Sequence, residues 1–317
     1  MEENITLILA LYAAGLAVSG LLYAYRLGKA GEKRLCALFG IILGLPLAYA
    51  GAKLFFLLQH MGLDIGNWTA EKAFLPRWEE MSFVGGCLGF TLGVWISAKI
   101  LRVSGRKALD LFAVPGCILI AFARMAETGM GTIGQGDMPS FLPSVFPFAV
   151  VDDWDDAKLA VFTLEALAAL LCALWLILAG RKRSGHGGHF EKACIVLCSV
   201  QLFLEMLVDI WITFIISFIH MDQVLCAVIL LVIVIRGSVR NQKAGPAVAA
   251  VLLMGLNALT QFIQDKPYLL PVLNGVNVGT LAVVVFALCS AGLIVAGLQA
   301  VGYCRNDGSE SSKGSYA

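Results

Sequence analysis

Charged side chains are scarce in this chain. Of its 317 residues, 14% are charged and 59% are hydrophobic, and 23 Lys and Arg nearly balance 22 Asp and Glu. A soluble domain cannot bury that much apolar surface, so a soluble globular class is excluded and a polytopic membrane protein is indicated. The net charge of +1 also argues against nucleic acid as a partner.

The chain also lacks paired cysteine motifs and a basic N-terminus. Its nine cysteines are scattered, most of them inside apolar segments, and none forms a Cys-x-x-Cys pair. We interpret them as small buried hydrophobic residues, and we expect neither disulfides nor a metal site. The acidic start, Met1 to Asn4, lacks the basic residues of a cleavable signal peptide. We therefore expect the first helix to be retained, with its N-terminus outside.

Long apolar runs, by contrast, are abundant. Nine of them approach the roughly 17–25 residues that cross a bilayer as a helix. They are Ile5–Tyr25, Leu35–Leu58, Met81–Leu101, Leu109–Ala126, Leu159–Gly180, Ala193–Ile212, Gln223–Ile235, Gly245–Ile263 and Val276–Tyr303. The seventh run is short, and Phe214–Ile219 could extend it. We predict an all-α transmembrane helix bundle of about nine spans.

Basic residues are concentrated in alternate connections between these runs. Most of the 23 Lys and Arg follow the first, third, fifth and seventh runs or lie in the C-terminal tail. The positive-inside rule makes these connections cytoplasmic and predicts an N-out, C-in topology. The long connection 127–156 then lies outside, where it could cover a site, meet an extracytoplasmic partner or be only a solvated acidic loop.

Five charged residues interrupt the predicted spans, and all fall in the half of the bilayer predicted to face outward. A charged side chain at mid-bilayer costs about 2.5–3.5 kcal/mol on insertion scales, so it needs a partner or a polar cavity. The shared depth predicts one polar chamber, with ion pairs that only join helices as the alternative. Gln201 and Glu205, four residues apart, should share a helix face. The five are Lys53, Arg124, Glu165, Glu205 and Asp209.

Glycines recur every four residues at the start of the third span. Gly85, Gly89 and Gly93 form a small-xxx-small pattern, which favours close packing of two helices. The N–H groups of Gly85 and Gly86 could instead face an anion at the helix N-terminus. His60 and His220 stand at predicted outer helix ends; we interpret them as interfacial residues, although either could act as a base.

Seven short segments carry a family resemblance through their order and spacing. They are 51–55 (Gly-Ala-Lys-Leu-Phe), 81–86 (Met-Ser-Phe-Val-Gly-Gly), 124–132, the Pro-rich stretch 139–147, Glu165, 201–205 (Gln-Leu-Phe-Leu-Glu) and 220–223 (His-Met-Asp-Gln). Together they resemble the bacterial prolipoprotein diacylglyceryl transferase family from about Tyr12 to Ile235. That family moves diacylglycerol from phosphatidylglycerol to the thiol of a lipobox cysteine on the outer face of the plasma membrane.

The resemblance implies a multi-pass protein of the bacterial plasma membrane that needs no cofactor. Its partners would be a phospholipid, phosphatidylglycerol, and prolipoprotein signal peptides. Residues 1–243 would form a transferase-like domain of seven spans. Residues 244–304 would add two helices, and 305–317 would be a disordered cytoplasmic tail.

The chain departs from the family pattern at five aligned positions. Val84 stands where the family has histidine, and Glu127 and Thr132 replace its asparagine and glutamate. Lys53 and Gln201 each replace an arginine. The resemblance therefore carries over the fold and a lipid-facing chamber, whereas the reaction depends on what these replacements do.

The expected reaction needs a cation for the phosphate leaving group, a base for the thiol proton and alignment of the two reacting atoms. Arg124 and Lys53 would hold the phosphate, and Glu205 or Glu165 would act as the base or orient it. The expected catalytic residues are Arg124, Glu165 and Glu205, and the expected substrate-binding residues are Lys53, Ser82, Gly85, Gly86, Glu127, Gly131 and Gln201. A non-catalytic relative that binds lipid or lipoprotein and a small-solute transporter remain as alternatives.

Overall fold

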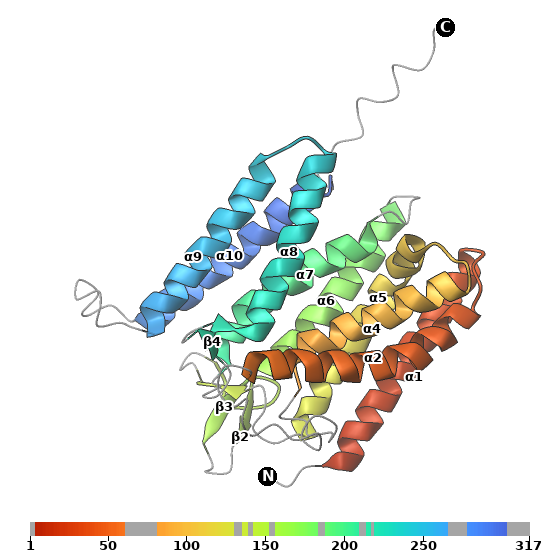
Figure 1. Cartoon of the computed structure of the whole chain (residues 1–317). Helices are drawn as coiled ribbons and strands as arrows, with labels where there is room; N and C mark the ends of the chain where they lie inside the picture. Colours follow the sequence, from red (N-terminus) through yellow and green to blue (C-terminus); the bar gives the residue numbers. More distant parts are fainter. Residues whose placement is uncertain are drawn as a thin grey trace, which may run out of the picture.

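The fold is a bundle of long helices (Figure 1). The computed structural model describes residues 4–60, 81–129, 135–138, 142–151, 156–182, 188–208, 214–216, 219–265 and 278–302. Within these ranges there are nine α-helices: α1 Ile5–Lys29, α2 Leu35–His60, α4 Phe83–Ile100, α5 Gly105–Ala126, α6 Val161–Lys182, α7 His189–Leu204, α8 Met221–Arg240, α9 Gly245–Asp265 and α10 Val278–Ala300. The predicted all-α class is confirmed.

Eight of these helices are long and apolar enough to cross a membrane, and α7, with 16 residues, is the one below that length. Large apolar side chains are exposed on the outside of the bundle; Leu21 is 73% and Leu252 is 68% exposed. Such side chains belong against lipid tails, because water would penalise so much apolar surface. The chain is therefore a multi-pass membrane protein, and the orientation of its ends stays a prediction.

The sixth predicted span, Ala193–Ile212, differs from the structure at both ends. The helix α7 begins at His189 and ends at Leu204, and a 3₁₀ turn, η4 (Glu205–Leu207), follows it. The proposed helical extension of the seventh span was also wrong. Strand β4 (Phe214–Ile216) pairs antiparallel with β5 (Ile219–His220), as expected for a segment rich in β-branched isoleucine.

The long connection 127–156 begins with a 3₁₀ turn, η3 (Glu127–Gly129), and contributes to a small antiparallel sheet. Its strands are β1 (Gln135–Gly136), β2 (Ala149–Val151) and β3 (Ala157–Ala160), in the order β1-β3-β2. Strand β3 takes the first residues of the predicted fifth span, so α6 begins at Val161. Strands β2, β3 and β4 lie at the end of the bundle where α1 begins (Figure 1).

Helices α2 and α4 pack backbone against backbone along the predicted glycine ridge. A Cβ atom built on Gly89 would lie 2.0 Å from the carbonyl oxygen of Leu47, and one on Gly93 would lie 2.5 Å from Gly44 Cα. Any side chain at these positions would force the helices apart. The small-xxx-small spacing therefore predicted a real close contact, and that contact sets where the N-terminus of α4 lies.

Helices α9 and α10 pack against α7 and α8 (Figure 1). Ser290 of α10 donates a 2.7 Å hydrogen bond to the carbonyl of Ser199 on α7, and Asn241 donates one of 2.6 Å to the carbonyl of Ala300. Ile195, Leu230 and other buried residues of α7 and α8 share one hydrophobic cluster with α9 and α10. The two last helices thus complete the side of the bundle that α7 and α8 form.

Candidate functional site

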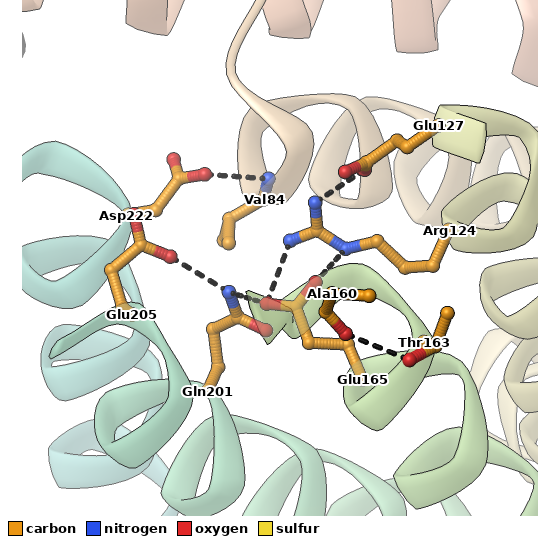
Figure 2. A network of polar contacts seen from close by, with 9 residues as sticks. All are labelled: Val84, Arg124, Glu127, Ala160, Thr163, Glu165, Gln201, Glu205 and Asp222. Atoms are coloured by element: carbon orange, nitrogen blue, oxygen red, sulfur yellow. Dashed lines mark hydrogen bonds and ion pairs between the residues drawn. The ribbon is translucent and has the colours of Figure 1, made fainter. Parts of the chain in front are cut away.

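Polar side chains from five helices gather at one end of the bundle (Figure 2). They come from the C-terminal ends of α5 and α7 and from the N-terminal ends of α4, α6 and α8. These ends meet because consecutive spans run in opposite directions. The polar set comprises the buried residues Ser82, Arg124, Glu127, Glu165, Glu205 and His220 and the half-buried residues Gln201 and Asp222.

Arg124 lies between two carboxylates (Figure 2). Its Nη1 donates to Glu127 Oε1 at 2.6 Å, and its Nε is 2.6 Å from Glu165 Oε2 while Nη2 donates to Glu165 Oε1 at 3.2 Å. The ring of Phe83 covers one face of the guanidinium, with its centroid 3.6 Å from Cζ. Only 8% of Arg124 is exposed. Burial among two carboxylates and an aromatic ring makes this guanidinium the electrostatic centre of the site.

Gln201 connects Arg124 and Glu165 to a third carboxylate, that of Glu205. Its Nε2 donates to Glu165 Oε1 at 2.6 Å and to Glu205 Oε2 at 2.8 Å. The second contact confirms that Gln201 and Glu205 share a helix face. The other oxygen of Glu205, Oε1, lies 3.2 Å from His220 Nδ1. One continuous polar chain therefore runs from Glu127 through Arg124 to His220.

The N-terminus of α4 is occupied by Asp222 of α8. Ser82 Oγ donates to Asp222 Oδ1 at 2.6 Å, and the backbone N–H of Val84 donates to Asp222 Oδ2 at 3.4 Å. The N–H of Gly85 donates to Ser82 Oγ, and that of Gly86 donates to the Ser82 carbonyl. The alternative interpretation, in which these two N–H groups face an anion, does not hold in this structure, because both donate to Ser82. A carboxylate of the protein itself takes the position that the helix dipole favours for an anion.

The remaining predicted residues are placed as follows. Lys53 is buried on α2, directly after Ala52, whose carbonyl accepts a 3.1 Å hydrogen bond from the N–H of Ser82. Gly131 and Asp209 lie outside the described residues, as does the side chain of His60. Of the five charged residues expected to share a chamber, Arg124 and Glu165 are joined directly, and Glu205 is joined to them through Gln201.

Sequence reasoning missed two members of the site. His220 was interpreted as interfacial, but it is only 4% exposed and is paired with Glu205. Asp222 was not counted among the charges of the spans, because the seventh run was started one residue after it. An acidic residue in the first turn of an apolar helix was the available signal, since such a residue must find donors as the helix enters the bilayer.

Two further features surround the chain of polar contacts. A cavity of about 400 Å³ is lined by Thr128, Phe162 and six residues of the segment 144–151, most of them apolar.

Burial raises the pKa of the Glu127 carboxyl above its ordinary value, and the Arg124 guanidinium opposes part of that rise. Within the described ranges, no three His, Cys, Asp or Glu side chains are grouped so that they could hold a metal ion.

The comparison with protein families identifies a family for most of the chain. The family model described as prolipoprotein diacylglyceryl transferase matches residues 7–237. No curated protein and no solved structure matches the chain significantly. The matched stretch extends from α1 nearly to the end of α8 and includes every residue of the polar chain, whereas α9 and α10 lie beyond it.

Proposed function

Because this chain belongs to the prolipoprotein diacylglyceryl transferase family, we propose that it transfers diacylglycerol from phosphatidylglycerol to the thiol of a prolipoprotein lipobox cysteine. The reaction would take place at the outer leaflet of a bacterial plasma membrane. The observation that supports this most is the series of polar contacts that joins Arg124, Glu165, Gln201, Glu205 and His220 at one end of the bundle. The positive-inside rule predicts that this end faces outward.

The reaction forms one bond and breaks one. The cysteine sulfur bonds to the terminal glyceryl carbon of the lipid, and the bond between that carbon and its phosphate oxygen breaks. Glycerol phosphate leaves with the electron pair, and the thiol proton must go to a base. Catalysis therefore needs a cation at the phosphate, a base at the thiol and a fixed alignment of the sulfur with the glyceryl carbon.

Arg124 is the group that supports phosphate binding best. A guanidinium binds a phosphate with two parallel hydrogen bonds. Arg124 already contacts both oxygens of Glu165, through a hydrogen bond from Nη2 to Oε1 and a 2.6 Å ion-pair contact between Nε and Oε2. The headgroup would replace Glu127, whose contact comes from a short 3₁₀ turn, while Glu165 keeps the guanidinium in place. Lys53 would supply a second positive charge from α2.

The other expected roles follow from this placement. Gln201 would fix the positions of the Glu165 and Glu205 carboxylates beside the substrate. The N-terminal turn of α4 would line the headgroup through the residues Ser82, Gly85 and Gly86, and Glu127 would border it on the other side. Gly131 stays an expected binding residue outside the described ranges. The apolar cavity beside Thr128 is suited to a nonpolar part of either substrate.

The test is a reconstituted transfer assay. Purified protein in vesicles of phosphatidylglycerol is mixed with a lipobox peptide, and mass spectrometry records the thioether product and released glycerol phosphate. We expect both products with the wild type and at least a ~100-fold lower rate with Arg124→Gln. Glu32→Gln is the matched control, because Glu32 pairs with Lys107 away from the site. Folded, lipid-bound protein that forms neither product contradicts the proposal.

A second candidate is a relative that binds lipid or lipoprotein without turnover. It is favoured by one specific observation: both groups suited to an anion, Arg124 and the N-terminus of α4, are occupied by carboxylates of the chain itself. In that case a phospholipid would copurify with the wild type and be lost with Arg124→Gln, while the transfer assay would give neither thioether product nor glycerol phosphate. The same experiment therefore separates the two functions.

A further inference from the structure

The polar chain ends in a histidine and carboxylate pair. His220 Nδ1 lies 3.2 Å from Glu205 Oε1, and the other oxygen of Glu205 accepts a 2.8 Å hydrogen bond from Gln201. Glu205 is 7% and His220 is 4% exposed. A carboxylate held at both oxygens fixes the rotation of the imidazole beside it, as in catalytic His–Asp pairs.

The backbone holds His220 in place as well. The residue ends strand β5 and precedes the first turn of α8, and its N–H donates a 3.1 Å hydrogen bond to Gln223 Oε1. Glu205 lies in the 3₁₀ turn that follows α7. Two independent segments thus bring the imidazole and the carboxylate together, so the pair does not depend on one mobile side chain.

The other carboxylates of the site already contact a cation or hydrogen-bond donors. Glu165 is in contact with Arg124 and Gln201, and Glu127 is in contact with Arg124. Asp222 accepts hydrogen bonds from Ser82 and from the N–H of Val84. The donors on Glu165 and Asp222 occupy lone pairs that would otherwise receive the thiol proton.

We propose that His220 is the acid–base group of the transfer reaction and that Glu205 is its positioning residue. This rests on the proposed function. It replaces the expectation that Glu205 or Glu165 takes the thiol proton. Imidazole is the side chain whose protonation changes nearest neutral pH, and an adjacent carboxylate stabilises the imidazolium that forms.

The proton and electron balance is complete without a further reagent. The thiol of the lipobox cysteine gives its proton to the imidazole of His220, and the sulfur forms its bond to the glyceryl carbon. The electron pair of the broken carbon–oxygen bond leaves on the phosphate of glycerol phosphate. The proton then passes from His220 to that phosphate monoester or to water, which restores the neutral imidazole.

The charged groups around His220 influence the pH profile of kcat/KM. Glu205 contacts it from η4, Asp222 lies two residues later on α8, and Glu165 with Arg124 acts through Gln201. Protonation of the imidazole before the thiol arrives removes the base. The value of kcat/KM should therefore fall on the acid side of its pH profile.

The test compares His220→Gln, Glu205→Gln and the control His189→Gln in the transfer assay across pH. His189 is also a buried histidine, but it begins α7 at the opposite end of that helix. We expect His220→Gln to lower kcat at least ~100-fold without lowering phosphatidylglycerol binding, and to remove the acid limb of the profile. Glu205→Gln should lower kcat less and shift that limb. His189→Gln should keep both the rate and the limb.

Three results would overturn the inference. If His220→Gln has activity close to that of the wild type and keeps the acid limb, the role of His220 is contradicted and the proposed function still stands. If His220→Gln does not fold, the wild-type profile decides, because a kcat/KM that does not fall toward acid pH contradicts a histidine base. A wild type without any turnover would overturn the proposed function and this role together.

Discussion

Ser82 donates a 2.6 Å hydrogen bond to Asp222, which lies 140 residues later in the chain. The contact joins the N-terminus of α4 to the first turn of α8. Asp222 thereby supplies both a partner for Ser82 and a negative charge at a helix N-terminus. The two segments that border the site are thus held together by the polar groups that the substrate would meet.

The contact should be measurable as a coupling energy. We expect Ser82→Ala and Asp222→Ala each to lower the free energy of unfolding, and the double variant to lose less than their sum by about 1 kcal/mol, as for polar pairs in other membrane proteins. Unfolding in detergent micelles would measure it. Strictly additive losses would mean that the hydrogen bond contributes nothing to stability.

Removal of Arg124 should destabilise the fold through the carboxylates it leaves behind. Arg124→Gln strands Glu127 and Glu165 in a buried site, and we expect a loss of about 3–5 kcal/mol in the free energy of unfolding. Adding Glu165→Gln should restore part of that loss, because one stranded charge disappears. A double variant less stable than Arg124→Gln alone would show that the charge balance is not the cause.

Neutralising Glu127 should strengthen lipid binding. Glu127→Gln removes one of the two carboxylates that hold Arg124, so the guanidinium is easier for a lipid phosphate to reach. We expect KM for phosphatidylglycerol to fall roughly fivefold, which is ~1 kcal/mol. Glu32→Gln, the control away from the site, should leave KM unchanged. A higher KM in Glu127→Gln would instead mean that this carboxylate contacts the substrate.

Alanine at two glycines of α4, three residues apart, should change the free energy of unfolding in different ways. A Cβ on Gly89 would lie 2.0 Å from the Leu47 carbonyl oxygen, whereas one on Gly86 would meet nothing closer than 3.6 Å. We expect Gly89→Ala to lower the free energy of unfolding by about 1–3 kcal/mol, the usual cost of overpacking. Gly86→Ala should be neutral or stabilising, because alanine favours a helix over glycine. Equal losses in thermal unfolding would contradict the packing role.

The packing of α10 on α7 gives a prediction for the last two helices. A Cβ on Gly297 would lie 2.5 Å from Ile195 Cγ2. We expect Gly297→Val to lower the melting temperature in detergent while kcat/KM of the folded protein stays unchanged, since the site lies at other helix ends. A loss of kcat/KM without a loss of stability would instead give these helices a part in catalysis.

The helices were predictable because a span leaves a long, uninterrupted signal. Their positions follow from runs of apolar residues that no soluble fold would tolerate, and the family resemblance, confirmed by the match over 7–237, was carried by short motifs in order. The misplaced end of α7 and strand β4 fall in the apolar stretch after Glu205. There hydropathy cannot distinguish a helix from a strand, because both bury the same side chains.

Long apolar runs were enough to predict the membrane class and the helices. They also marked the charged residues that need partners, because burial of a charge in a bilayer is costly wherever it occurs. Which partners these residues find depends on how the helices pack. Arg124 pairs with Glu165, 41 residues away, and Glu205 with His220, because α5, α6, α7 and α8 bring their ends together. Such pairings depend on helix packing and turn geometry, which no local pattern of residues encodes.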